Sequence, residues 1–190
     1  MTNDDLLLTS GKKKGGYLPL FAKKSSAVWN TDFPEVFVYT EKEVYGIPGK
    51  GFSEILTDNN KKYKITFEIT SASVKAFYYA FDDCTNLTSV SFPELTSIDS
   101  KAFYYAFYGC TNLTSVSFPK ASSIDSEAFY YAFYGCTNLT SVSFPKLTSA
   151  SNSAFYSIGH SNLTIHLPKS LSNAGLDTQG SFYGKIVYDL

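Results

Sequence analysis

Residues 76–101 read AFYYAFDDCTNLTSVSFPELTSIDSK, and this unit returns almost unchanged at residues 102–127 and 128–153. A fourth, degenerate copy begins at Ala154. Near identity at one fixed period is the sequence signature of a solenoid, in which each unit buries its apolar face only against its neighbours. The sequence therefore predicts a stack of about four 26-residue units over residues 76–170.

Each unit is predicted to contain one short β-strand. In the second unit Leu113, Val116 and Phe118 are separated by hydroxyl side chains, a spacing typical of a strand with one buried side. Pro119 ends this strand because proline has no N–H group to donate to a sheet ladder. We expect the strands of successive units to stack in parallel.

The segment between two strands is predicted to be a short helix or helical turn. In residues 128–135, AFYYAFYG, the alanines and phenylalanines fall within one arc of about 140° on a helix, and the tyrosines fall on the other side. Asp125 or Ser126 suits the start of this helix, and Gly135 suits its end. The predicted unit is one strand plus one short helix, so the expected fold class is an α/β repeat.

The segment before the repeats is predicted to cap the stack. Residues 63–69 alternate apolar and polar side chains, as a half-buried strand does, and the polar residues 58–61 suit a hairpin turn. Residues 53–75 are therefore expected to form an N-terminal β-hairpin cap. Residues 1–52 are expected to be an extension or docking segment with a small β element within residues 36–45.

The C-terminal segment, residues 171–190, is predicted to cap the other end. Its last apolar stretch, residues 182–188, indicates a final strand. A cap at each end covers the edge of a stacked sheet, which would otherwise be open to pairing with other chains.

The order alanine-phenylalanine, cysteine, LxxVxFP and LxxI over about residues 63–170 resembles the BspA-like leucine-rich repeats of bacterial surface proteins. The chain departs from that family in its longer, tyrosine-rich stretch AFYYAFYGC, where the family has a shorter AFxxC. The resemblance implies a right-handed leucine-rich-repeat solenoid, a position at the cell surface and a role in adhesion.

Charge and composition argue against nucleic acid as a partner. The formal net charge is −1, and all 16 basic residues are lysine, whereas arginine is the side chain that most often reads bases and phosphates. The apolar run at residues 6–8 is too short for a signal peptide or a spanning helix. We therefore expect neither nucleic-acid binding nor membrane insertion.

Two polar residue types recur once in each unit. We expect Cys84, Cys110 and Cys136 to form a column of buried, unpaired thiols; a disulfide or a metal site is the alternative. An asparagine that also begins an N-L-T sequon precedes each strand and is predicted to bond to turn backbone. These asparagines are Asn86, Asn112, Asn138 and Asn162.

No residue pattern typical of catalysis is evident. The two histidines, His160 and His166, both lie in the degenerate fourth unit and have no evident nucleophile near them in the pattern. We therefore expect no enzymatic activity, no cofactor and no metal ion.

Two repeated surface rows are candidate ligand-binding sites. Tyrosine offers a large contact area at low entropy cost, so stacked tyrosines on a convex side suit recognition, although they could instead stiffen that side. The strand hydroxyls suit a partner, a glycan or ice, or are ordinary solvent-facing groups. The candidate residues are Tyr104, Tyr105, Tyr130, Tyr131, Tyr134, Thr114, Ser115, Ser117 and Thr140.

The sequence favours a non-enzymatic binding module that recognises a host surface protein or glycan. The alternative is a phage virion component, such as a tail or head fibre or receptor-binding protein, in which residues 1–52 dock to other virion proteins. The missing signal peptide and the lysine-only basic set favour this alternative. The expected location is thus extracellular, at the cell surface or on a virion.

Overall fold

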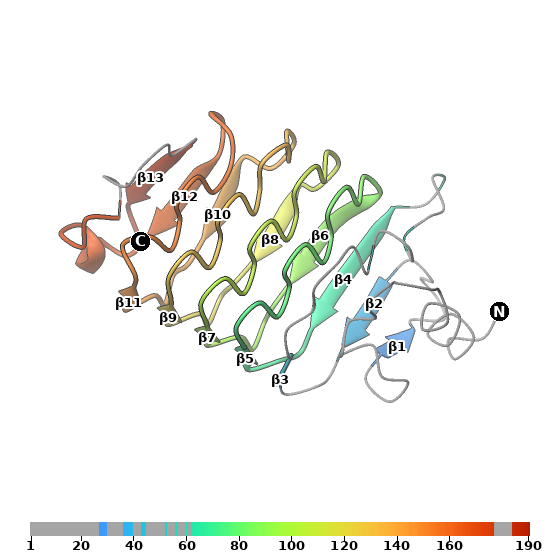
Figure 1. Ribbon diagram of the computed structural model, residues 1–190, viewed down its shortest axis with the longest axis horizontal. Helices are drawn as coiled ribbons and strands as arrows, with labels where there is room; N and C mark the ends of the chain where they lie inside the picture. Colours follow the sequence, from blue (N-terminus) through green and yellow to red (C-terminus); the bar gives the residue numbers. More distant parts are fainter. Residues whose placement is uncertain are drawn as a thin grey trace.

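The computed structural model describes residues 62–176 and 184–190, the backbone of three strands within residues 27–44, and the single residues Phe52, Leu56 and Asn60. The chain winds as a β-solenoid, so that segments one repeat apart lie side by side along one axis (Figure 1). This arrangement confirms the prediction of a repeat solenoid.

The first side of the solenoid carries the longer strands. They are β2 (Val36–Tyr39), β4 (Tyr63–Phe67), β6 (Leu87–Ser91), β8 (Ser115–Ser117), β10 (Ser141–Ser143), β12 (Thr164–Leu167) and β13 (Lys185–Tyr188). One sheet has the order β1-β2-β4-β6-β8 and another has the order β10-β12-β13. All neighbours pair in parallel except β1 (Ala27–Trp29), which pairs antiparallel with β2.

The second side carries a five-stranded sheet of two-residue strands, in the order β11-β9-β7-β5-β3. They are β3 (Glu43–Val44), β5 (Ser71–Ala72), β7 (Ser97–Ile98), β9 (Ser123–Ile124) and β11 (Ser149–Ala150). Each short strand follows one long strand, so the described part of the chain forms about five coils rather than the four that the repeats predict. Two of these coils, β2–β3 and β4–β5, precede the first repeat unit, and the fourth unit contributes β12 without a short strand after it.

The third side of the solenoid consists of turns, so the predicted short helix is wrong. The segment between Lys101 and Cys110 is a run of turns, and the only helical element in the described residues is the 3₁₀ turn η1 (Lys169–Leu171). The backbone φ is positive at every fourth residue of the run, at Lys101 (58°), Tyr105 (54°) and Gly109 (72°). An α-helix cannot contain such residues, because their left-handed conformation breaks its hydrogen-bond ladder.

Hydrogen bonds in these turns alternate between two destinations. Tyr78 N–H donates to Lys75 O of its own coil (3.2 Å), whereas Tyr79 N–H donates to Tyr104 O of the next coil (3.1 Å). The same alternation continues along the run, and Phe81 N–H donates to Ala106 O (2.8 Å). An α-helix would use these N–H groups internally. The turns instead link each coil to the next, which is why the repeat favours them. We name these turn segments, residues 74–83, 100–109, 126–135 and 152–157, the turn face.

Stacked phenylalanines fill the space between the turn face and the long strands. On the turn side, the rings of Phe77, Phe103 and Phe129 stack at centroid distances of 4.8 and 5.1 Å. On the strand side, Phe92 and Phe118 stack at 5.0 Å, and Phe118 meets Phe103 edge to face at 5.4 Å. All of these rings are buried. The core is therefore a set of aromatic columns that run along the solenoid axis.

The three cysteines are buried free thiols, as predicted. Cys110 Sγ donates to Phe81 O (3.0 Å) and Cys136 Sγ donates to Phe107 O (2.9 Å), each in the preceding coil. Burial raises the pKa of the Cys110 thiol well above its usual value. The Cys110 thiol therefore stays protonated, and the thiols of Cys110 and Cys136 act as hydrogen-bond donors between coils.

Two of the predicted asparagines, Asn112 and Asn138, also link coils, and this confirms their predicted backbone bonding. Asn112 Nδ2 donates to Thr85 O (2.7 Å), and Asn138 Nδ2 donates to Thr111 O (2.7 Å). Each of these bonds reaches back 27 residues along the chain. The repeated polar residues thus bond to backbone that neighbouring coils present.

The N-terminal strands do not form the expected hairpin. β4 pairs in parallel with β2 on one side and with β6 on the other, so it is an inner strand of the solenoid. Strands do lie at residues 36–39 and 185–188, where the apolar patterns predicted them. The remainder of the predicted 1–52 docking segment, most of residues 53–61 and residues 177–183 lie outside the described residues.

The turn run makes a testable prediction at Gly135. Gly135 has φ +79°, and a Cβ added there would lie 3.2 Å from Gly109 Cα. We expect Gly135→Ala to lower the free energy of unfolding by about 1–2 kcal/mol or more, because alanine is strained in this conformation.

Urea unfolding followed by circular dichroism measures this effect. Lys146→Ala is the control, since Lys146 is exposed and its loss should change stability by no more than about 0.5 kcal/mol. A stabilised Gly135→Ala variant would contradict the turn assignment.

Candidate functional site

The turn face presents nine tyrosines in columns, which we name the tyrosine face. They are Tyr78, Tyr79, Tyr104, Tyr105, Tyr108, Tyr130, Tyr131, Tyr134 and Tyr156. The first column stacks at centroid distances of 5.1, 4.7 and 5.5 Å from Tyr78 to Tyr156. The second column stacks at 4.8 and 5.1 Å, and Tyr108 stacks on Tyr134 at 5.2 Å. The expected stacking of tyrosines along the convex rows is therefore present.

These rings are half-buried, and only Tyr134 is exposed at 40% of its surface. The turn run alternates two buried residues, an alanine and a phenylalanine, with two outward residues that are mostly tyrosines. The four-residue turn period thus separates core from surface as cleanly as a helix would. Each ring of the first column lies against its neighbours.

Three tyrosines of the face, Tyr104, Tyr105 and Tyr130, have hydroxyl groups held in their neutral form. Burial, and next the adjacent Tyr130, raise the pKa of Tyr104 to about 12. The pKa of Tyr105 is also raised to about 12, mainly by burial and secondly by Tyr79. Burial is again the main cause that raises the pKa of Tyr130. At neutral pH the face therefore offers uncharged hydroxyl groups that can donate and accept hydrogen bonds.

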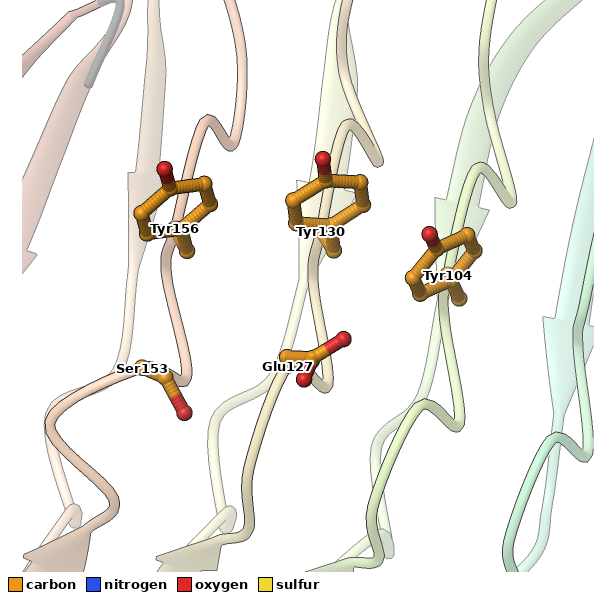
Figure 2. Close-up of a pocket in the computed structure, with 5 residues that line it drawn as sticks. All are labelled: Tyr104, Glu127, Tyr130, Ser153 and Tyr156. Atoms are coloured by element: carbon orange, nitrogen blue, oxygen red, sulfur yellow. The ribbon is translucent and has the colours of Figure 1, made fainter. Parts of the chain in front are cut away.

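A shallow hollow of about 410 Å³ opens in the tyrosine face between the last coils. Its lining residues are Tyr104, Glu127, Tyr130, Ser153 and Tyr156. In Figure 2 the three rings stand in a row on successive coils, with Glu127 and Ser153 beneath Tyr130 and Tyr156. Aromatic rings and a carboxylate therefore line one space.

The hydroxyl residues of the long strands form a separate surface, the hydroxyl face. Among the predicted residues, Ser115 and Thr140 are exposed, and Ser117 is half-buried. Some of these hydroxyls already bond within the solenoid. Thr114 Oγ1 donates to Thr88 O (3.0 Å), and the hydroxyls of Ser91 and Ser117 are hydrogen-bonded at 2.9 Å.

The structure does not bring the two predicted residue sets together. The tyrosine face lies on the turns and the hydroxyl face on β6, β8 and β10, and the phenylalanine core separates them. A small ligand can therefore contact only one of the two sets. The hollow lies within the tyrosine face.

Glu127, Ser153 and Tyr156 are hollow residues that the sequence-based site did not include. The repeat alignment carries a signal for two of them. Residues 75 and 101 are lysines, whereas the aligned residues of the later units are Glu127 and Ser153. A position that changes charge within near-identical repeats marks a place where the surface differs.

The described residues show no other chemical centre. Within the parts of the chain that the structure describes, no group of three His, Cys, Asp or Glu side chains is placed to hold a metal ion. His166 Nδ1 contacts Asp189 Oδ2 at 2.9 Å, and His160 Nε2 contacts Leu139 O at 3.1 Å. The described part of the chain also contains no helix long and apolar enough to cross a membrane.

The raised tyrosine pKa values predict alkaline destabilisation. Tyrosine in an unfolded chain has a pKa of about 10, so folding favours the neutral form of Tyr104 and Tyr105. This stabilisation is complete below about pH 10 and is lost as the pH rises through about 12. We expect the free energy of unfolding to fall across this window, and less steeply in Tyr104→Phe.

Tyrosinate absorbance and circular dichroism at each pH measure this effect. The chain in urea is the control, and its tyrosines should ionise near pH 10. Complete ionisation of the folded chain by about pH 11 would contradict the assignment.

Comparisons with known proteins address the repeat region. Residues 104–184 match the family model described as a BspA type leucine-rich repeat region of six copies. No curated protein matches the chain, and no solved structure matches it. The match includes the last three tyrosines of the first column, which line the hollow. Residues 104–184 of this chain are therefore similar to a BspA-type leucine-rich repeat region.

Proposed function

We propose that the chain is a non-enzymatic binding module, displayed at a cell surface, whose tyrosine face recognises a host surface protein or a glycan. The observation that carries this proposal is the set of stacked, half-buried tyrosines on the turn face. The match of residues 104–184 to a BspA-type leucine-rich repeat region supports a surface repeat protein. The fold alone does not specify a function, so the argument rests on the surface.

The stacked rings suit recognition because they are ordered before a ligand arrives. Binding normally costs about 0.5–1.5 kcal/mol for each flexible side chain that becomes fixed. A ring that already stacks on neighbours at about 5 Å has lost most of that freedom. The tyrosine face therefore offers aromatic area and hydroxyl groups at a reduced entropic cost.

The tyrosine face is the better candidate of the two surfaces. On the hydroxyl face, Thr114 and Ser117 already engage neighbouring coils. Small hydroxyl side chains also bury little apolar area against a partner. We assign the contact role to Tyr104, Tyr105, Tyr130, Tyr131 and Tyr134, and we keep Thr114, Ser115, Ser117 and Thr140 as the comparison surface.

The same face would serve a phage virion component, the alternative that the lysine-only basic set favours. In that arrangement the solenoid faces outward as a receptor-binding part of a tail or head fibre, and the N-terminal segment contacts other virion proteins. Gold-labelled antibodies against the chain, viewed on purified virions and on intact cells, separate the two locations.

Binding of the labelled full chain to intact cells tests the proposal. We expect Tyr105→Ala combined with Tyr131→Ala to reduce binding at least about tenfold, since each removed ring costs about 1.4 kcal/mol or more if it lies in a hot spot. Ser115→Ala combined with Thr140→Ala is the matched control and should bind as the unaltered chain does. Protease or glycosidase treatment of the cells distinguishes a protein receptor from a glycan.

The tyrosine variants must also be shown to fold. Tyr105→Phe combined with Tyr131→Phe keeps both rings and their stacking and removes only the hydroxyl groups. Circular dichroism and urea unfolding confirm the fold of each variant before binding is compared. Equal cell binding by the folded alanine variant and the unaltered chain would overturn the assignment.

A further inference from the structure

The repeat places a different residue beside each tyrosine of the first column. The residue three positions before the tyrosine is Lys75 for Tyr78 and Lys101 for Tyr104. Lys75 Nζ lies over the Tyr78 ring at 5.5 Å from its centroid, and Lys101 Nζ lies over Tyr104 at 5.8 Å. Both distances lie within the range of a cation–π contact. In two coils the chain itself therefore supplies an ammonium group to the ring face.

The next two coils lack this ammonium group. Glu127 stands three residues before Tyr130, and Ser153 stands three residues before Tyr156. The hollow of about 410 Å³ opens at these two coils. Figure 2 shows Ser153 and Glu127 beside each other beneath their rings, with the rings in a row above them. The hollow thus lies where the lysine side chains of the first coils have no counterpart.

Glu127 has an ammonium partner on only one side in this row. Its Oε2 atom lies 3.5 Å from Lys101 Nζ, in the preceding coil. In the following coil the aligned residue is Ser153, whose side chain is short and uncharged and so gives the carboxylate no ammonium partner. An ammonium group in the position of a lysine side chain at residue 153 would meet the Tyr156 ring and the Glu127 carboxylate together. This repeats the environment that Lys101 has with Tyr104 and Glu127.

We propose that the hollow lined by Tyr104, Glu127, Tyr130, Ser153 and Tyr156 binds an alkylammonium group in the part near Ser153, with Glu127 as its counter-ion and the tyrosine rings as its cation–π surface. This inference rests on the proposed function of the tyrosine face as a ligand-binding surface and names the ligand chemistry. The lysine side chain of a partner protein and the quaternary ammonium group of a choline headgroup share this chemistry. The hollow is large enough for either group.

The charge distribution selects a cation over other ligands. An anion would lie against the carboxylate of Glu127, and a neutral alcohol would gain the ring contacts without the charge attraction. The site is open to solvent, so a single ammonium group binds weakly, and a partner that presents several such groups gains affinity through multivalency. A repeat surface with other contacts beside the hollow fits such a partner.

Nuclear magnetic resonance of the full chain tests the proposal by following the tyrosine ring signals. Three probes are titrated at constant ionic strength: choline chloride, an Nα-acetyl-lysine methylamide, and 3,3-dimethylbutan-1-ol as the neutral isostere of choline. We expect saturable shifts with at least one ammonium probe and at least about tenfold weaker binding of the neutral isostere. A choline-only response identifies a headgroup as the source, and a lysine-only response identifies a protein side chain.

Three variants place the binding at the hollow. Ser153→Lys supplies the missing ammonium group from the chain itself, so we expect it to abolish the response to both ammonium probes. Glu127→Gln removes the counter-ion and should weaken ammonium binding several-fold while leaving the neutral isostere unchanged. Ser141→Lys adds the same charge to the exposed hydroxyl face and should leave binding as in the unaltered chain.

Equal binding of choline and its neutral isostere, absence of a saturable response to both ammonium probes, or full ammonium binding by a folded Ser153→Lys variant would overturn the proposal. The outcome of the cell-binding experiment is independent of the outcome of the ammonium titration. Loss of cell binding in the tyrosine variants together with no ammonium response would leave the proposed function standing and remove this inference. An ammonium response together with cell binding that does not depend on the tyrosines would remove the proposed function and leave the ammonium site standing.

Discussion

The alternation of backbone N–H groups along the turn face is the constraint on which the rest of the structure depends. One N–H bonds back to its own coil and the next bonds to the following coil, as Tyr78 and Tyr79 show. Because the linking bonds come at every second residue, successive coils are fixed in register over the whole run. Buried backbone groups must find partners, and this pattern satisfies them without a helix or a regular strand. The aromatic columns follow from it.

Register at the backbone sets the spacing of the side chains. Identical residues one unit apart lie about 5 Å from each other, which is a stacking distance for aromatic rings. The same spacing brings Lys120 Nζ to 2.7 Å from Glu94 Oε2 and Lys101 Nζ to 3.5 Å from Glu127 Oε2. A change at one repeat position is therefore felt by its counterparts in the coils on either side. The hollow exists because two such changes fall in neighbouring coils.

Much of this architecture could be predicted from the sequence, because the repeat and the alternation around Val116 report burial directly. The prediction of a short helix was wrong because alanine-phenylalanine pairs four residues apart fit a four-residue turn run as well as a helix of 3.6 residues per turn. Positive φ at Tyr105 and Tyr131 could not be predicted, since tyrosine has no preference for that conformation. The coil of β2 and β3 lacks the repeat motif, and the hollow requires three-dimensional alignment of Glu127 with Ser153.

The near-identity of the coils also bears on how such a surface evolves. A tandem duplication or deletion of one 26-residue unit in the gene would add or remove a whole layer while every remaining layer kept its hydrogen bonds. Point substitutions at a single outward position, such as the series Lys75, Lys101, Glu127 and Ser153, would then diversify the surface without disturbing the scaffold. The number of repeat units and the side chains on their outer surface can therefore change independently of each other.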